Sequence, residues 1–166
     1  SCEQCSSEAT ACYKTQIIQS FYSQPATFNT LIDLTGGYGI DTFFMAQHAE
    51  QAHYVERNAE LCAIAEHNFS LYRPHIQIHN TTAEAFLASL PHHPLAQRPI
   101  GGTPSNSIAS NSAASHTLIY LDPARRSQSG GKVFRIEDCE PNVIDLLPTL
   151  RRHASHIMIK FSPMLD

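Results

Sequence analysis

Five short apolar runs alternate with stretches of helical periodicity, and this alternation constrains the fold more than any other feature of the chain. The apolar runs are 30–34, 52–56, 76–79, 117–122 and 157–161. Apolar residues recur at helical spacing in 6–22, 41–49, 58–72, 83–90 and 141–152. Strands that alternate with helices form parallel β-α-β units, so the sequence predicts an α/β fold: a doubly wound, mostly parallel sheet with helices on both faces.

The 166 residues are enough for one domain with a sizeable core. We expect residues 1–29 to form a helical segment and residues 30–166 to form the α/β core. Within that core, residues 91–116 are rich in Pro, Gly, Ser, Asn and His and show no periodicity. That composition predicts a flexible surface insertion.

Charge and cysteine content limit the partners of the chain. The formal net charge is −4, so the chain as a whole does not attract nucleic acid or anionic membrane. No apolar stretch has the length of a membrane span and no signal peptide is visible, which favours a cytoplasmic protein. The Cys2-x-x-Cys5 pair with Cys12 lacks a fourth ligand at standard spacing, so we expect reduced thiols and no metal.

The stretch "LIDLTGGYGID" at 31–41 joins the first predicted strand to the helix that follows it. A glycine-rich turn at this place in a parallel sheet lets the backbone come close to a nucleotide-like ligand. The dinucleotide fingerprint G-x-G-x-x-G would need a glycine at position 42, which is Thr42. The turn therefore disfavours a dinucleotide.

An acid followed by this turn resembles motif I of class I S-adenosylmethionine-dependent methyltransferases, D/E-x-G-x-G-x-G, with Thr35 at the first glycine. The resemblance implies that S-adenosylmethionine is the cofactor. It implies that Asp33 helps to hold the amino-acid end of the cofactor, directly or through water. The main chain at three glycines would lie against its methionine and ribose, with Asp41 closing the turn: Gly36, Gly37 and Gly39.

Two further strand ends fit the same resemblance. Glu56 ends the second strand, where the family carries an acid that takes both ribose hydroxyls, and Arg57 follows it. By itself such an acid is also compatible with a solvated strand end. After the third strand the chain has Thr82 where the family has an acid near the adenine amino group. Binding of the adenine is then either weaker or made through the backbone at Ala83.

The segment "LIYLDPARR" at 118–126 resembles motif IV of nucleic-acid methyltransferases, D/N-P-P, with Ala124 at the second proline. In the members that methylate amino groups, the acid side chain and the next carbonyl accept hydrogen bonds from the target nitrogen. The resemblance gives these parts to Asp122 and Pro123. The alternative is that Asp-Pro is only a strand-ending turn.

Nearly the whole chain, apart from 91–116, resembles a group of bacterial RNA methyltransferases that carry a THUMP-like or ferredoxin-like domain elsewhere. The resemblance implies an RNA partner, bound through a domain absent from this chain. It also implies a seven-stranded sheet, of which the last two strands would be missing. The oligomeric state is not predicted.

The choice of target atom depends on the nucleophile that the enzyme needs. Carbon-5 pyrimidine enzymes need a cysteine, and Cys139 is the only candidate nearby. Methylation of an amino group needs only Asp122 and Pro123, so an amino group of an RNA base is the expected target.

Three cations follow Asp122 and would suit a phosphate-bearing substrate: Arg125, Arg126 and Lys132. The alternative is a solvated loop that pairs with the acids at 137, 138 and 140. In the N-terminal segment, Tyr13 and Lys14 either fold over the cofactor or belong to an ordinary capping helix. A cofactor-binding module without catalysis remains a second function, and an NAD-dependent dehydrogenase a third.

Overall fold

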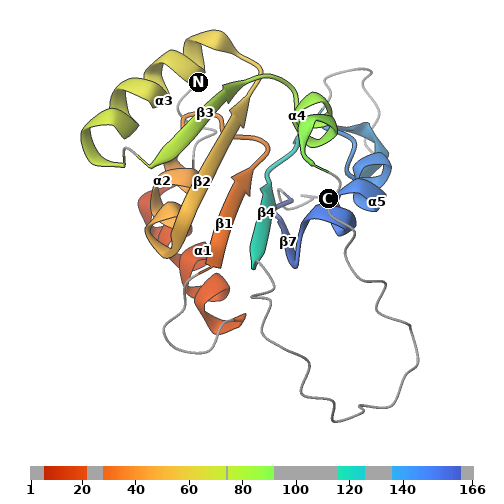
Figure 1. The fold of residues 1–166 in the computed structure, drawn as a ribbon, viewed down its shortest axis with the longest axis horizontal. Coiled ribbons are helices and arrows are strands. Elements are labelled where there is room, and N and C mark those ends of the chain that lie inside the picture. Colours follow the sequence, from red (N-terminus) through yellow and green to blue (C-terminus); the bar gives the residue numbers. More distant parts are fainter. Residues whose placement is uncertain (1–5, 22–27, 74, 92–115, 126–135, 162–166) are drawn as a thin grey trace, which may run out of the picture.

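The structure is a computed structural model that describes residues 6–21, 28–73, 75–91, 116–125 and 136–161 (Figure 1). The helices are α1 (Glu8–Phe21), α2 (Ile40–Met45), α3 (Ala59–Tyr72), α4 (Ala83–Ser89) and α5 (Val143–His153). The main strands are β1 (Phe28–Asp33), β2 (Ala49–Glu56), β3 (Ile76–Asn80), β4 (Thr117–Leu121) and β7 (His156–Ile159). The described residues also include two short 3-10 helices, η2 (Ala46–His48) and η3 (Ile136–Asp138).

The five main strands form one sheet in the order β3-β2-β1-β4-β7, and each neighbouring pair is parallel. Leu31 in the central strand pairs with Ala52 on one side and Leu118 on the other. The predicted parallel α/β fold is therefore confirmed. The strand order reverses between β1 and β4, and ligands of such sheets bind at the carboxyl side of this switch point.

Two apolar clusters fill the two faces of the sheet. The first joins α1, α2 and α3 to one face through Ile18, Met45 and Phe69. The second joins α4 and α5 to the opposite face through residues such as Phe86 and Leu150. Successive residues of a strand point to opposite faces, so each central strand supplies both clusters, which explains why these strands are apolar throughout.

Side-chain caps fix three of the turns that leave the sheet. The Asn58 side chain accepts hydrogen bonds from backbone N–H groups at the start of α3, and Asn142 does the same for α5. The Thr82 hydroxyl accepts from the N–H of Ala85 at the start of α4. Such caps stabilise a helix by about 1 kcal/mol each, and here they also fix where the preceding strand end lies.

A small hairpin was not predicted from the sequence. Strand β5 (Ala124–Arg125) pairs antiparallel with β6 (Cys139–Glu140). It brings Glu140 back beside the segment that follows β4. Two-residue strands are too short to show periodicity, and for this reason the sequence indicated only a loop there. Of the predicted insertion at 91–116, all but the first and last residues lie outside the described part of the chain.

Among the described residues, no helix has the length and apolar character needed to cross a membrane. In the same part of the chain, no group of three or more His, Cys, Asp or Glu side chains is arranged to hold a metal ion.

Candidate functional site

A pocket of about 640 Å³ lies where the carboxyl ends of β1, β2, β3 and β4 meet. This volume is in the range of small-molecule sites. Each strand end contributes residues that were singled out from the sequence: Thr35, Gly36, Gly37, Asp41, Glu56, Arg57, Thr82, Ala83 and Asp122. The topology thus brings together nine positions that are spread over most of the chain.

The glycines of the turn after β1 are needed mainly for packing inside the protein. A Cβ atom on Gly36 would lie 2.2 Å from the ring of Tyr54, whose hydroxyl donates to the Gly37 carbonyl at 2.5 Å. Gly39 has a φ of 80°, and a Cβ there would lie 2.7 Å from Phe69. Of the three, only Gly37, with a φ of 52°, would bring its Cβ into no close contact, the nearest atom being the Thr35 carbonyl oxygen at 3.8 Å. Packing inside the protein therefore requires glycine at positions 36 and 39, and the contact of the three glycines with a ligand stays a prediction.

Asp33 lies beneath the turn and does not line the pocket. It is 1% exposed; one carboxylate oxygen accepts from the Thr35 N–H at 3.0 Å and the other from the Thr42 hydroxyl at 2.6 Å. Burial raises the pKa of Asp33 to about 7, although both hydrogen bonds lower it. Thr42, which breaks the dinucleotide fingerprint, thus serves as the partner of Asp33, and the pair holds the turn to the start of α2.

The Glu56 carboxylate joins the turn to the start of α3. Its Oε2 accepts from the Gly37 N–H at 3.0 Å, and its Oε1 accepts from the Asn58 N–H at 2.8 Å. The next residue, Arg57, forms an ion pair with Glu140 of the small hairpin. Because both members of this pair line the pocket, the pair links the β2 end to the hairpin across the side of the site.

The end of β3 contributes Thr82 and Ala83. The Thr82 hydroxyl is used as the cap of α4, and Ala83 is buried. Neither residue supplies a carboxylate, but Glu84 and Glu60 also line the pocket nearby.

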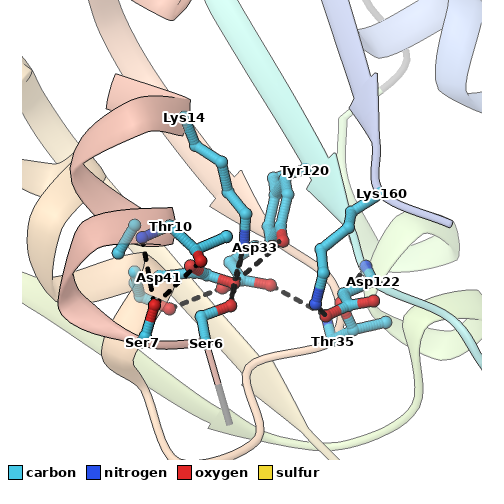
Figure 2. A network of polar contacts seen from close by, with 12 residues as sticks. Ser6, Ser7, Thr10, Lys14, Asp33, Thr35, Asp41, Tyr120, Asp122 and Lys160 are labelled. Atoms are coloured by element: carbon cyan, nitrogen blue, oxygen red, sulfur yellow. Dashed lines mark hydrogen bonds and ion pairs between the residues drawn. The ribbon is translucent and has the colours of Figure 1, made fainter. Parts of the chain in front are cut away.

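Figure 2 shows how Asp122 is held at the end of β4. Its N–H donates to the Thr35 hydroxyl at 2.7 Å, and its Oδ2 accepts from Lys160 Nζ at 2.5 Å. Thr35 stands where the family pattern has glycine, and its hydroxyl ties the turn after β1 to the end of β4. Lys160 was missed in the sequence. It lies within the last predicted strand, 157–161, and the parallel register of β7 with β4 places it beside Asp122.

A second network fastens α1 to the site (Figure 2). Lys14 Nζ donates to Ser6 at 2.8 Å, to Asp41 Oδ2 at 2.5 Å and to the Tyr120 hydroxyl at 2.9 Å. The Tyr120 hydroxyl in turn donates to Asp41, and burial raises the pKa of this phenol. Tyr13 is 61% exposed and belongs to no such network. Asp41 Oδ1 is buried and has no hydrogen-bond partner among the described residues.

Several predicted residues fall elsewhere. Pro123 follows Asp122 and is half-buried, outside the pocket lining. The backbone of Arg125 lies in β5, while Arg126 and Lys132 lie outside the described residues, as do Cys2 and Cys5. Cys139 is fully buried and does not line the pocket, so none of the described residues that line the pocket is a cysteine.

The charge of the pocket lining is strongly acidic. Among the described residues of the lining, one guanidinium, that of Arg57, stands against six carboxylates: Asp41, Glu56, Glu60, Glu84, Asp122 and Glu140. Lys14 and Lys160 neutralise two of them from outside the lining. Such a pocket favours a cationic ligand over a phosphate.

No protein-family model matches the chain, and no curated protein sequence matches it. Its structure is similar to that of a "putative methyltransferase" from Porphyromonas gingivalis W83, with 30% identity over 99% of the chain and a TM-score of 0.67. The chain spans 33% of the length of that protein.

Two more distant structures are similar over most of the chain. One is a "putative RNA methyltransferase" from Pyrococcus horikoshii, with 10% identity, a TM-score of 0.54, and coverage of 90% of this chain and 57% of that one. The other is an rRNA methylase from Streptococcus thermophilus, with 13% identity, a TM-score of 0.51, and coverage of 91% and 71%. The chain therefore has the Rossmann-like fold of class I methyltransferases.

Proposed function

We propose that this chain binds S-adenosylmethionine and forms the catalytic core of a methyltransferase that acts on an amino group of a base in RNA. The observation that carries the proposal is the acidic pocket at the switch point of the sheet, where the turn after β1, Glu56 and Asp122 meet. The likeness to the Porphyromonas gingivalis protein supports it.

The residues of the pocket fit the proposed cofactor. S-adenosylmethionine carries a sulfonium and an ammonium and no phosphate, which suits a lining of six carboxylates and one guanidinium. Glu56 lies at the end of β2, where its carboxylate would bind the ribose hydroxyls. Asp41 Oδ1, a buried oxygen without a hydrogen-bond partner in the described residues, would suit the ammonium. The backbone at Thr82 and Ala83 would bind the adenine.

The chemistry needs little from the protein beyond orientation. When bound, the cofactor supplies an electrophilic methyl group. Asp122 and the Pro123 carbonyl would accept hydrogen bonds from the substrate amino group and so aim its lone pair. A nitrogen–carbon bond forms as the carbon–sulfur bond breaks, and the nitrogen then loses one proton, for which the Asp122 carboxylate is an acceptor. No cysteine nucleophile is required, and the described residues that line the pocket include none.

The acidic lining also weighs against a dehydrogenase that binds a dinucleotide. A pyrophosphate would face six carboxylates. One of them, Asp41, lies in the first turn of α2, where a pyrophosphate would otherwise meet the start of the helix. For the same reason, RNA phosphates would be bound outside this pocket. The predicted cations Arg125, Arg126 and Lys132 would serve that purpose, together with a domain outside this chain.

Calorimetry with S-adenosylhomocysteine tests the cofactor assignment. Glu56→Ala should weaken binding by about 10- to 100-fold, because charged hydrogen bonds to two hydroxyls are lost. Glu66→Ala, an exposed acid on α3, is the matched control and should bind as the wild type does. Equal affinities for the wild type and Glu56→Ala would refute the role of Glu56.

Transfer of a labelled methyl group to RNA by the full-length protein tests catalysis. Asp122→Ala should abolish transfer and leave the affinity for S-adenosylhomocysteine nearly unchanged, since Asp122 would contact the nucleophile. Cofactor binding without any methyl transfer by the wild type would instead support the cofactor-binding module.

A further inference from the structure

Asp122 and Lys160 place a hydrogen-bond acceptor and a hydrogen-bond donor side by side at the end of β4, where Asp122 lines the pocket and Lys160 lies just outside the lining. Lys160 Nζ lies 2.5 Å from Asp122 Oδ2. Among the described residues, Asp122 Oδ1 has no hydrogen-bond partner, and Lys160 Nζ has no partner except Asp122. Both groups therefore keep hydrogen-bonding capacity for a ligand.

The main chain fixes this pair in position. The Lys160 N–H donates to the Leu121 carbonyl at 2.9 Å, which continues the pairing of β7 with β4. The Asp122 N–H is held by the Thr35 hydroxyl at 2.7 Å. Two neighbouring strands thus present the donor and the acceptor from a rigid edge, as base recognition requires.

Stability does not account for the pair. The two side chains are 26% and 29% exposed. Ion pairs that solvent reaches contribute little to folding. The other lysine pair, Lys14 with Asp41, is far more buried at 7% and 11%, and it fastens a helix. The Asp122–Lys160 pair is only partly buried and fastens no helix.

We propose that Asp122 and Lys160 together recognise a base whose amino group lies next to a ring nitrogen that accepts hydrogen bonds, as in adenine and cytosine. This inference rests on the proposed function. Asp122 would accept from the amino group that is methylated, while Lys160 donates to the neighbouring ring nitrogen. Enzymes that modify bases recognise them through hydrogen bonds to such edges.

The same pair selects against guanine. On its Watson–Crick edge, guanine presents an N–H beside its amino group, so Lys160 would face a donor with a donor. The other neighbour of that amino group, N3, lies against the ribose. An unpaired or opposed polar group in a recognition site lowers affinity for the wrong base.

The test uses the full-length protein, labelled S-adenosylmethionine and total bacterial RNA, followed by digestion to nucleosides and mass spectrometry. The label should appear in N6-methyladenosine or N4-methylcytidine. Label in N2-methylguanosine would overturn the inference and leave the proposed function intact. If the wild type labels no RNA at all, the proposed function itself fails, and the inference with it.

Variants of Lys160 give the second test. Lys160→Met should lower kcat/KM for RNA by about 10- to 100-fold, while Lys160→Arg, which can still donate, should recover part of the loss. The affinity for S-adenosylhomocysteine should stay within about twofold, which shows that the variants are folded. Arg152→Met, which removes an exposed cation from the end of α5, is the matched control. Unchanged kcat/KM in Lys160→Met would refute the proposal.

Discussion

Asp33 makes the stability of the fold depend on pH in a direction opposite to that of most carboxylates. Burial raises its pKa from 3.8 to about 7. Between these values the folded protein binds more protons at this site than the unfolded chain does. The free energy of unfolding therefore falls as the pH rises from about 4 to about 7. Above pH 7 the folded protein carries the full cost of a buried charge.

The size of the effect follows from the shift. Each pH unit between 5 and 7 lowers the free energy of unfolding by about 1.4 kcal/mol. The wild type should therefore lose roughly 2–3 kcal/mol of stability through Asp33 between pH 5 and pH 8. Asp33→Asn keeps the shape and an acceptor for the Thr35 N–H but removes the ionisation. The stability of the variant relative to the wild type should therefore rise by roughly 2–3 kcal/mol over the same range.

Urea unfolding at pH 5, 6, 7 and 8 measures this difference. Other titrating groups are common to both proteins and cancel in the comparison. Glu66→Gln, an exposed acid on α3, serves as the control and should show a difference that does not change with pH. If the difference between Asp33→Asn and the wild type is also independent of pH, the reasoning about Asp33 is wrong.

Three further predictions concern the turn, the ammonium site and the opposite pH limb. Gly36→Ala should lower the free energy of unfolding by about 1–3 kcal/mol in urea titrations, because its Cβ would overlap the Tyr54 ring; no loss would contradict that packing. Asp41→Asn should lower the affinity for S-adenosylhomocysteine about 10-fold in calorimetry. The affinity for 5′-methylthioadenosine, which lacks the amino-acid end, should not change. Equal losses of affinity for both ligands would contradict an ammonium contact. His53 Nδ1 lies 3.0 Å from His79 Nε2, and burial lowers the pKa of both rings. The unfolded chain therefore binds protons at these rings more readily than the folded protein does, and stability should fall as the pH drops below 6.5. His79→Gln should make that fall shallower in urea titrations, and an unchanged slope would argue against a role of this ring.

The fold could be predicted because its signal is local. Each strand and helix is a contiguous stretch with its own periodicity, and alternation alone implies a parallel sheet. The positions of Glu56 and Asp122 followed from the same reasoning, since the carboxyl ends of parallel strands meet at one edge. The hairpin of Ala124–Arg125 with Cys139–Glu140 was missed because its only signal is a contact between distant residues.

The functions of individual side chains in the site were harder to predict. The sequence shows that Asp33 precedes a turn, but not that Thr42 turns its carboxylate inward. The crowding around Gly36 comes from Tyr54, 18 residues later on another strand, so spacing cannot reveal it. Lys14 meets Asp41 across 27 positions, through the packing of α1 on α2. Each of these contacts depends on which elements pack together.

The site contains the same arrangement twice, a lysine that forms an ion pair with one oxygen of an aspartate. Lys14 holds Asp41 through Oδ2, and Lys160 holds Asp122 through Oδ2. In each pair the Oδ1 atom has no partner among the described residues. A carboxylate that forms an ion pair through one oxygen keeps the other oxygen as a strong acceptor. The charges of Asp41 and Asp122 raise the pKa of Asp33, and the two lysines offset part of that effect. The protein can therefore offer one acceptor to a cationic ligand and another to a substrate amino group within a single pocket, without placing two bare carboxylates beside a third that is buried.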